Sequence, residues 1–269
     1  MPDTIQKGDT GPDVMLCQER LTIHGYPTAA DGIFGSGTEQ KVMQFQGANG
    51  LSVDGIVGPA TWDALLAPPS EEVEPPQPLP AVLEHLKSLG HKVVWQGDYH
   101  LNLFGIRNPN AKANSFDDIL GVAYTVNGMW RVHYWPGTTD PGTYWLENPM
   151  NVDGTAILVE GQYLDTWVIG LHGSYEALSQ EAGVVQVYRD SNKDDILDLD
   201  PSTVQEGWFG INIHRSSTSG ESTEVNKWSA GCQVHARIAG FDEMMCLAHK
   251  QVDVLGIDTF TFTLMDQWW

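Results

Sequence analysis

Residues 67–80, APPSEEVEPPQPLP, constrain the fold more than any other part of the sequence, because neither a helix nor a sheet can continue through them. The stretch holds six prolines and three glutamates. Each proline lacks a backbone N–H and fixes φ, so clustered prolines favour a stiff, extended spacer. The sequence therefore predicts two folded regions, residues 1–66 and 81–269, joined by a linker at 67–80.

The first region contains an internal repeat. The phrase DGIFGSGT begins at Asp31, and DGIVGPAT begins at Asp54. In each copy the aspartate favours a turn, the following glycine tolerates a positive φ, and the threonine, Thr38 or Thr61, lies near the start of a helix. Apolar residues recur at helical spacing around these turns, which predicts a small helical core. That core is expected to contain Val14, Cys17, Leu21, Val42 and Phe45, with Cys17 as buried filler.

The two stretches KGDTGPDVMLCQERL and ADGIFGSGTEQKVMQFQGANGLSVDGIVGPATWDALL resemble the PG-binding-1 family of peptidoglycan-binding modules. The resemblance covers nearly all of residues 5–66. It implies a three-helix bundle that binds bacterial peptidoglycan. A helical module of the same fold without affinity for the cell wall is the alternative, since fold alone does not establish a site.

The second region is expected to be mainly β, which makes the whole chain α+β. Residues 81–90 predict a short helix that ends at Gly90. The stretches GVAYTVNGMWRVHYW, TAILVEGQYLDTWVIGLH and GVVQVYRD are rich in β-branched and aromatic residues and are broken by Gly, Asn and Pro. Within residues 238–251 apolar side chains recur at i, i+3, i+4 and i+7, which predicts a helix beside the sheet. DTFTFTLM then alternates as a late strand.

Charge and cysteine content exclude several classes of protein. With 35 acidic and 14 basic residues the formal net charge is −21, which repels nucleic acid and anionic membranes. No apolar run approaches the roughly 18 residues that span a bilayer, so no membrane insertion is expected. MPDTIQKGDT shows no secretory signal, and three cysteines cannot all pair within the chain. We therefore expect a reducing compartment, no disulfides and a monomer.

One histidine and one cysteine frame the polar stretch NIHRSSTSGESTEVNKWSAGCQVH at residues 212–235. Cys232 follows small residues, which leave its sulfur and the nearby amides accessible. A thiol that attacks a carbonyl needs a base or cation to lower its pKa and N–H donors for the oxyanion. His214, on the expected strand FGINIH, can act on the thiol, and the amides around Gly231 and Cys232 can form the oxyanion pocket. The alternative is that both residues are structural.

This stretch resembles the signature of the L,D-transpeptidase family. There a histidine is followed, after about 14 to 17 residues, by Ser or Thr, a residue that is often His, Gly and the nucleophilic Cys. Fourteen residues separate His214 from Ser229, and Ala230, Gly231 and Cys232 follow. The resemblance implies that Cys232 is the nucleophile, His214 its partner, and Ser229 and Gly231 supports of the catalytic site. Ala230 stands where the family often has histidine, and QV where it usually has an apolar residue followed by Asn or Arg.

A second resemblance, to phage-encoded lysis proteins, spans most of residues 100–235. It is carried by TAILVEGQY, GLHGSYEAL, VYRDSNKDD, GINIHRSS and WSAGCQV. It implies a peptidoglycan hydrolase, or endolysin, that is made in the host cytoplasm without a signal peptide. Such an enzyme reaches the cell wall once a partner protein has permeabilised the membrane. His172, Trp228 and Arg215 are the expected substrate-binding residues.

Zinc sites are alternatives to the cysteine mechanism. Two C-x-x-H pairs, Cys232 with His235 and Cys246 with His249, formally supply four ligands. A triad of His133, His172 and His214 would instead make a zinc amidase, which hydrolyses the same polymer with metal-activated water. No H-E-x-x-H or comparable short motif supports that triad.

The stretch DSNKDDILDLD carries part of a calcium-loop pattern. Its ligands would be Asp190, Asn192, Asp194 and Asp198. Glycine is absent from position 6 and glutamate from position 12, which favours a solvated acidic turn. No cofactor is expected for the cysteine mechanism.

The sequence thus predicts a peptidoglycan hydrolase that cleaves stem peptides through an acyl-enzyme on Cys232. Release of the acyl group by an amine of another stem would instead cross-link peptides, as an L,D-transpeptidase does. The sequence is also compatible with a zinc-dependent amidase or with a non-catalytic wall-binding protein. Which bond is cut depends on the shape of the pocket, which these motifs do not define.

Overall fold

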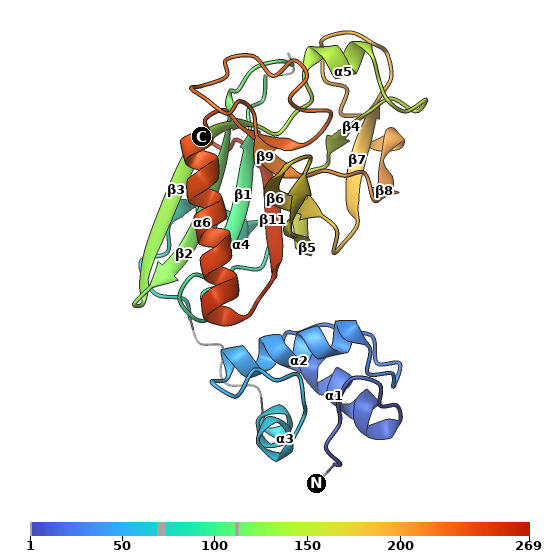
Figure 1. Cartoon of the computed structure of the whole chain (residues 1–269), viewed down its shortest axis with the longest axis vertical. Coiled ribbons are helices and arrows are strands. Elements are labelled where there is room, and N and C mark those ends of the chain that lie inside the picture. Colours follow the sequence, from blue (N-terminus) through green and yellow to red (C-terminus); the bar gives the residue numbers. More distant parts are fainter. Residues whose placement is uncertain (1, 69–73, 111–112) are drawn as a thin grey trace. The chain divides into compact units, whose positions relative to one another are not determined.

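The chain divides into two compact units, which Figure 1 shows in one computed structural model. The first comprises residues 1–77 with 253–257, and the second residues 78–252 with 258–269. The structure describes residues 2–68, 74–110 and 113–269. Residues 69–73 of the expected linker therefore lie outside the described residues. Within the described ranges, no helix has the length and apolar character needed to cross a membrane.

The first unit is helical, with α1 (Pro12–Ile23), α2 (Ser36–Ala48) and α3 (Pro59–Leu66). One hydrophobic core joins the three helices and the segments between them. Its buried residues are Ile5, Val14, Cys17, Leu21, Phe34, Val42, Phe45, Val57, Trp62 and Leu65. The predicted core positions are all among them. Cys17 is fully buried, which confirms the prediction of buried filler, and burial raises the pKa of its thiol to about 12.

The first Asp-Gly turn is held by a buried glutamine of α1. Gln18 Nε2 donates to Asp31 Oδ1 (2.8 Å), to the Ile33 carbonyl (3.1 Å) and to Thr38 Oγ1 (3.1 Å). Gln18 Oε1 accepts from the backbone N–H of Gly32 at 2.9 Å. The amide of one side chain therefore satisfies a turn that has no sheet or helix to pair with.

The second turn repeats this cluster one helix later. Gln46 Nε2 donates to Asp54 Oδ1 (2.8 Å), to the Ile56 carbonyl (2.9 Å) and to Thr61 Oγ1 (3.2 Å), and its Oε1 accepts from Gly55 N (3.0 Å). The repeated phrase in the sequence is thus a repeated hydrogen-bond cluster. The threonines serve these clusters, whereas α2 and α3 begin directly after glycines without a side-chain cap.

The second unit is built around a closed barrel of eight strands in the order β1-β11-β5-β6-β9-β10-β3-β2. The barrel strands are β1 (Asn102–Arg107), β2 (Asp118–Val126), β3 (Met129–Thr138), β5 (Gly161–His172), β6 (Tyr175–Gln180), β9 (Ile213–Arg215), β10 (Gln233–His235) and β11 (Thr259–Asp266). A separate three-stranded sheet contains β4 (Thr155–Leu158), β7 (Val185–Asp190) and β8 (Gln205–Gly207). The helical elements are α4 (Ala81–Ser88), α5 (Thr143–Glu147), α6 (Ile238–Leu255) and the 3-10 turn η1 (Pro201–Thr203). The prediction of a mainly β second region is confirmed.

Helix α6 covers part of the barrel with the apolar face that its sequence predicts. Phe241, Met244, Met245 and Ala248 are buried in the same core as Trp167 of β5. Their i, i+3, i+4, i+7 spacing places them on one side of the helix. The helix expected at residues 238–251 and the late strand are both confirmed.

The strand that carries His214 is shorter than the sequence suggests. FGINIH predicts a strand from Phe209, but β9 begins at Ile213. The side chain of Gln180 replaces a neighbouring strand there, since its Oε1 accepts from Phe209 N (3.2 Å) and from Ile211 N (3.0 Å). Trp167 Nε1 donates to the Ile211 carbonyl at 2.7 Å. The irregular segment before His214 is therefore held as firmly as a strand would be.

Candidate active site

The histidine of the motif lies on β9, and the cysteine directly precedes the neighbouring parallel strand β10. β9 pairs with β10, with Val234 opposite His214. Gln233 N donates to the Asn212 carbonyl at 2.8 Å, which continues the pairing one step before the strands. Side chains alternate along a strand, so Asn212 and Cys232 face the same side as His214 and Val234. The fold thus brings together residues 18 positions apart in the sequence, His214 and Cys232.

Cys232 lies directly before β10, which begins at Gln233, and its side chain is partly exposed. The backbone N–H of Asn212 donates to its Sγ at 3.4 Å, and the thiol can donate to the Gly210 carbonyl at 3.4 Å. Burial raises the pKa of the Cys232 thiol to about 11, and the Asn212 N–H opposes that rise. The resting cysteine is therefore a neutral thiol that needs a base before it can attack.

Ser229 and Gly231 fix the backbone of the cysteine. Ser229 Oγ donates to the Cys232 carbonyl at 2.8 Å and accepts from Gly231 N at 3.1 Å. Gly231 has φ +122°, and a Cβ there would lie 2.4 Å from the carbonyl oxygen of Ala156, so only glycine fits. The Gly231 N–H is thus already used. Among the described residues the Cys232 N–H has no acceptor, which makes it the better oxyanion donor.

His214 is almost fully buried, with 2% of its surface exposed. Its Nδ1 lies 2.8 Å from the Arg215 carbonyl, so Nδ1 carries the proton and donates it there. Its Nε2 is buried and has no hydrogen-bond partner within the described part of the chain. Burial, and after it the neighbouring His172 and the charge of Arg215, lower the pKa of His214 to about 4, while the hydrogen bond to the Arg215 carbonyl opposes this shift. His214 is therefore a neutral imidazole whose Nε2 lone pair is available, and no hydrogen bond joins it to Cys232 at rest.

His172, at the end of β5, stacks on His214 with ring centroids 4.1 Å apart and planes inclined by 13°. Asn212 Nδ2 lies 3.2 Å from His172 Nδ1, and Asn212 Oδ1 accepts from Gln180 N at 2.9 Å. Burial and the charge of Arg215 lower the pKa of His172. Three expected site residues, Cys232, His214 and His172, are thus gathered around Asn212.

The other two expected substrate-binding residues lie at the edge of this group. The guanidinium of Arg215 sits 3.9 Å from the ring centroid of Tyr175, whose hydroxyl lies 3.4 Å from His214 Nδ1. Trp228 is 44% exposed, and its backbone N–H donates to the Val225 carbonyl. The Arg215 side chain therefore contacts the site by way of Tyr175. The described contacts of Trp228 involve only its backbone.

Sequence reasoning missed Asn212 and Tyr175. Asn212 carried a usable signal, because it lies two residues before His214 and side chains alternate along a strand. Tyr175 gave no such signal, since only the pairing of β6 with β9, where Leu178 is opposite Ile213, brings it to the histidine.

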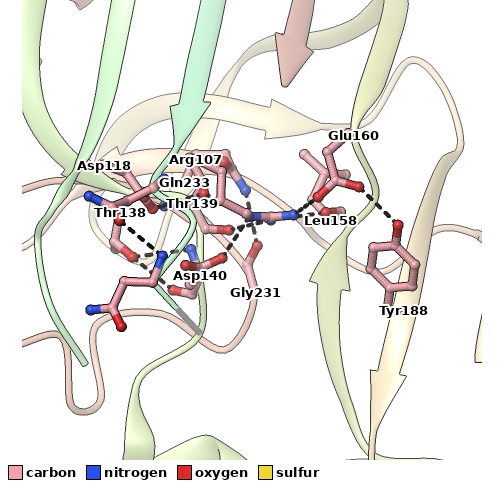
Figure 2. A network of polar contacts seen from close by, with 12 residues as sticks. Arg107, Asp118, Thr138, Thr139, Asp140, Leu158, Glu160, Tyr188, Gly231 and Gln233 are labelled. Atoms are coloured by element: carbon pink, nitrogen blue, oxygen red, sulfur yellow. Dashed lines mark hydrogen bonds and ion pairs between the residues drawn. The ribbon is translucent and has the colours of Figure 1, made fainter. Parts of the chain in front are cut away.

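A buried ionic network lies beside the cysteine loop (Figure 2). Arg107 forms ion pairs with Asp140, at 2.9 Å, and with Glu160. Asp118 accepts from the backbone N–H of Thr139 at 2.6 Å. Burial and the neighbouring Asp140 raise the pKa of Asp118 to about 7. A single buried cation thus organises several carboxyl groups next to the strands of the site.

The network meets the cysteine loop through Gln233. Gln233 Nε2 donates to the Gly231 carbonyl at 3.2 Å, and Figure 2 shows both residues beside Thr138 and Asp140. No sequence motif indicated Arg107 or Asp118, because the network depends on residues of β1, β2 and the loop after β3. Its place beside the loop suits a structural support for Cys232.

The side chains of the two zinc alternatives do not come together in the structure. Across the described ranges, no group of three or more His, Cys, Asp or Glu side chains is placed to hold a metal ion. His249 contacts Glu176 (3.1 Å), and His133 contacts Glu243 (2.9 Å), both away from the cysteine. His235, the partner of Cys232 in its C-x-x-H pair, is fully buried against Trp135.

The acidic turn at Asp190 is bonded to its own backbone. Asp190 Oδ2 accepts from Asp198 N (3.0 Å), Asp194 Oδ1 accepts from Ile196 N (2.8 Å), and Asn192 Nδ2 donates to Asp194 Oδ2 (3.0 Å). These contacts are those of an Asx-rich turn, in which side-chain oxygens replace backbone acceptors. The ligands of the calcium pattern therefore do not converge on one point.

An open depression of about 250 Å³ lies apart from these residues. It is lined by Glu160, Gly161, Gln162, Tyr163, Val184, Val185, Gln186 and Glu206. None of the candidate catalytic residues lines it. The chemistry of Cys232 therefore does not belong to this depression.

Comparison with known proteins identifies the helical unit. Residues 10–65 match the family model of a putative peptidoglycan binding domain. A peptidoglycan-binding protein of Clostridioides difficile, solved in complex with glutamine hydroxamate, is 49% identical over 23% of this chain and 40% of that chain, with a TM-score of 0.23. The match to the family model supports a peptidoglycan-binding domain at residues 10–65.

Two curated relatives match longer or similar stretches. The N-acetylmuramoyl-L-alanine amidase CwlL of Bacillus licheniformis is 31% identical over 153 residues, which is 52% of this chain and 42% of the amidase. The zinc D-Ala-D-Ala carboxypeptidase of Streptomyces albus G is 42% identical over 67 residues, 23% of this chain and 26% of that enzyme. The chain thus spans less than half the length of each relative.

Proposed function

We propose that this chain is a peptidoglycan hydrolase that cleaves stem peptides with Cys232 as its nucleophile. The match of residues 10–65 to the family model supports peptidoglycan as the substrate, and the names of both relatives describe enzymes of the cell wall. The observation that carries the proposal is the pairing of β9 with β10, which sets a partly exposed thiol on the same side as a neutral, buried imidazole. Nucleophilic catalysis by cysteine needs a base near the thiol, and the neutral His214 imidazole on the same side supports that role.

In the proposed cycle, His214 Nε2 takes the proton of the Cys232 thiol while the sulfur bonds to a carbonyl carbon of the stem peptide. The Cys232 N–H donates to the oxyanion. As the tetrahedral intermediate collapses, the amide C–N bond breaks and the leaving amine takes the proton from His214. Water then attacks the thioester and restores the thiol. Since the resting thiol and imidazole are both neutral, the thiolate forms only when substrate draws the pair together.

The finer features implied by the resemblances belong to the same proposal. We propose an L,D-transpeptidase-like catalytic domain and an endolysin that degrades the wall during phage lysis. His172, Arg215 and Trp228 would then contact the stem peptide from the rim of the site. The helical unit would keep the enzyme on insoluble wall, where tethering raises the local substrate concentration.

Mass spectrometry of muropeptides tests this function. Purified sacculi and soluble muropeptides are digested with the wild type, Cys232→Ala and, as a matched control, Cys246→Ala, whose thiol is exposed on α6. We expect shortened stem peptides with the wild type and the control, and none with Cys232→Ala. Hydrolysis by correctly folded Cys232→Ala would reject the cysteine mechanism.

The same spectra separate the competing reactions. Products of increased mass that join two stems would indicate transpeptidation. Release of intact peptide from the glycan would indicate an amidase. Sedimentation of residues 1–66 with sacculi in moderate salt tests the binding domain on its own, and failure of that fragment to sediment would reject wall binding.

A further inference from the structure

His214 shares its buried site with a second imidazole, that of His172. The two rings come from β9 and β5, which are separated in the barrel by β6 alone. Their centroids lie 4.1 Å apart and the planes are nearly parallel, at 13°. His214 is sealed from solvent, whereas His172 at the end of β5 is partly exposed. A proton that enters from solvent therefore meets His172 first.

We propose that His172 is a positioning residue for His214, and that the stacked rings of His172 and His214 take up one proton between them, under the control of Asn212. This inference rests on the proposed function, because it assigns the second histidine of that catalytic site. The nucleophile and base of the cycle stay Cys232 and His214. His172 acts through His214 by orienting its ring and by setting its protonation.

The single proton follows from the separation of the rings. Two like charges about 4 Å apart repel each other, and burial of the His214 ring weakens the screening of this repulsion by water. Once His172 is protonated, protonation of His214 is therefore disfavoured beyond the effect of burial. His214 keeps its Nε2 lone pair for the thiol to a lower pH than an isolated histidine would.

Asn212 determines which form of His172 is present. Because Asn212 Oδ1 accepts from Gln180 N, its amide group must face the other way, and Nδ2 donates to His172 Nδ1. Neutral His172 therefore carries its proton on Nε2. A second proton would have to go to Nδ1 and break the bond from Asn212, so this bond favours the neutral ring. The same asparagine offers its backbone N–H to Cys232 Sγ, which ties the histidine pair to the nucleophile.

The groups around the two stacked rings, apart from the Arg215 carbonyl, disfavour protonation of either imidazole. β9 contributes the cationic Arg215, β6 the hydroxyl of Tyr175, and β10 the buried neutral His235. Cys232 is a neutral thiol. Within the described residues no carboxylate contacts either ring, and His214 Nδ1 faces the Arg215 carbonyl at 2.8 Å and the Tyr175 hydroxyl at 3.4 Å.

Titration of the histidine rings by NMR tests the pair in the full chain. The wild type, His172→Phe and Asn212→Asp are labelled at histidine, with His249→Phe on α6 as the matched control. We expect His172→Phe to raise the pKa of His214 by about one unit, because it keeps an aromatic ring and removes the competing charge. Asn212→Asp is expected to raise the pKa of His172, since a carboxylate accepts from protonated Nδ1, and to lower that of His214. His249→Phe should change neither.

A midpoint for His214 that is the same in the wild type, His172→Phe and His249→Phe would overturn the inference. His172→Tyr serves as a second variant, so that a folding defect in His172→Phe does not end the test. The rate of Cys232 alkylation against pH provides the link to catalysis. Its acid limb should move upward in His172→Phe and downward in Asn212→Asp.

The inference and the proposed function fail in different ways. Shifted histidine titrations together with hydrolysis by Cys232→Ala would keep the histidine pair and reject the cysteine mechanism. Loss of hydrolysis in Cys232→Ala without any shift of His214 in either His172 variant would keep the mechanism and reject the pair.

Discussion

The helical unit and the barrel both bury polar side chains, but they treat them in opposite ways. Gln18 and Gln46 each use both ends of the side-chain amide, so the buried amide oxygen and nitrogen both have partners. His214 Nε2 is buried without one among the described residues, and so are both ring nitrogens of His235. A buried polar atom without a partner costs stability. The helical unit avoids that cost, and the barrel accepts it beside the cysteine.

The difference indicates which polar groups build the fold and which perform chemistry. A glutamine whose amide oxygen and nitrogen are both hydrogen-bonded holds a turn in place and has no free polar atom for a ligand. In the proposed mechanism, His214 Nε2, which has no partner within the described residues, is the atom that accepts the proton of the thiol. This contrast predicts that equivalent substitutions in the two units will affect different properties.

The largest effect is expected from one cysteine in each unit. Cys232→Ala should lower hydrolysis of soluble muropeptides by about 1,000-fold or more, because the proposed nucleophile is lost. Cys17→Ala should leave that rate unchanged and reduce only the stability of the helical unit, by about 1–2 kcal/mol for a small cavity. Steady-state rates and thermal unfolding of both variants check this. A rate loss in Cys17→Ala as large as that in Cys232→Ala would contradict the division between the units.

The next effect concerns acid. Burial lowers the pKa of His235 to about 3, below its ordinary value of 6.5. The unfolded chain therefore binds a proton first, and the stability due to the neutral ring is lost as the pH falls from 6.5 towards 3. His235→Phe should remove this dependence, so that its stability relative to the wild type rises by about 3 kcal/mol between pH 7 and pH 4.

Denaturant unfolding at a series of pH values measures this difference. The relevant quantity is the change with pH, since any repacking cost of the larger ring is the same at each pH. Parallel stability curves for His235→Phe and the wild type would show that His235 is protonated as easily in the folded state as in the unfolded chain.

A smaller effect is expected from the satisfied clusters. Gln46→Ala leaves the Gly55 N–H and the hydroxyl of Thr61 without their partner, which should cost the helical unit about 1–3 kcal/mol. Gln18→Ala should cost a similar amount, because its cluster has the same contacts. Hydrogen exchange of the α2 and α3 amides reports this local loss. Cleavage of soluble muropeptides should be unaffected, and a large loss there would mean that the cluster does more than hold a turn.

The smallest effect is expected at Asp54. Hydrogen bonds from Ile56 N and Gln46 lower the pKa of this exposed carboxyl below 3.8. Its contribution is therefore present above that value and is lost as the pH falls through the lower folded pKa. Asp54→Asn should slightly destabilise the helical unit at pH 7, and the difference should shrink as the pH falls below the folded pKa of Asp54. A destabilisation that persists unchanged at the lower pH would assign the effect to packing and not to charge.

The sequence predicted those parts of the molecule whose physics is local. The Asp-Gly phrases, the apolar face of α6 and the spacing between His214 and Cys232 are short-range patterns, and the structure contains the corresponding elements. The extent of β9 was wrong, because the side chain of Gln180, 29 residues before Phe209, takes the place of a strand partner.

Such short-range patterns could not predict which distant residues come together at the site. His172 lies 42 residues before His214 and meets it only through the order of strands around the barrel. Arg107 and Glu160 are 53 residues apart and meet through barrel closure as well. An arginine or a glutamate gives no periodic signal of burial. A buried charged residue is recognised by its partners, and these are not adjacent in the sequence.

The pairing of β1 with β11 also sets an order of events during synthesis. Leu103 lies beside Phe262 in a parallel register, so the barrel cannot close until the ribosome has released a segment made 159 residues later. Such distant contacts slow folding, whereas the contacts of the helical unit are local and form early. The nascent chain should therefore acquire its wall-binding domain well before its proposed catalytic site. Activity would begin only with the last strand of the barrel, so that each molecule is inert while it is being made.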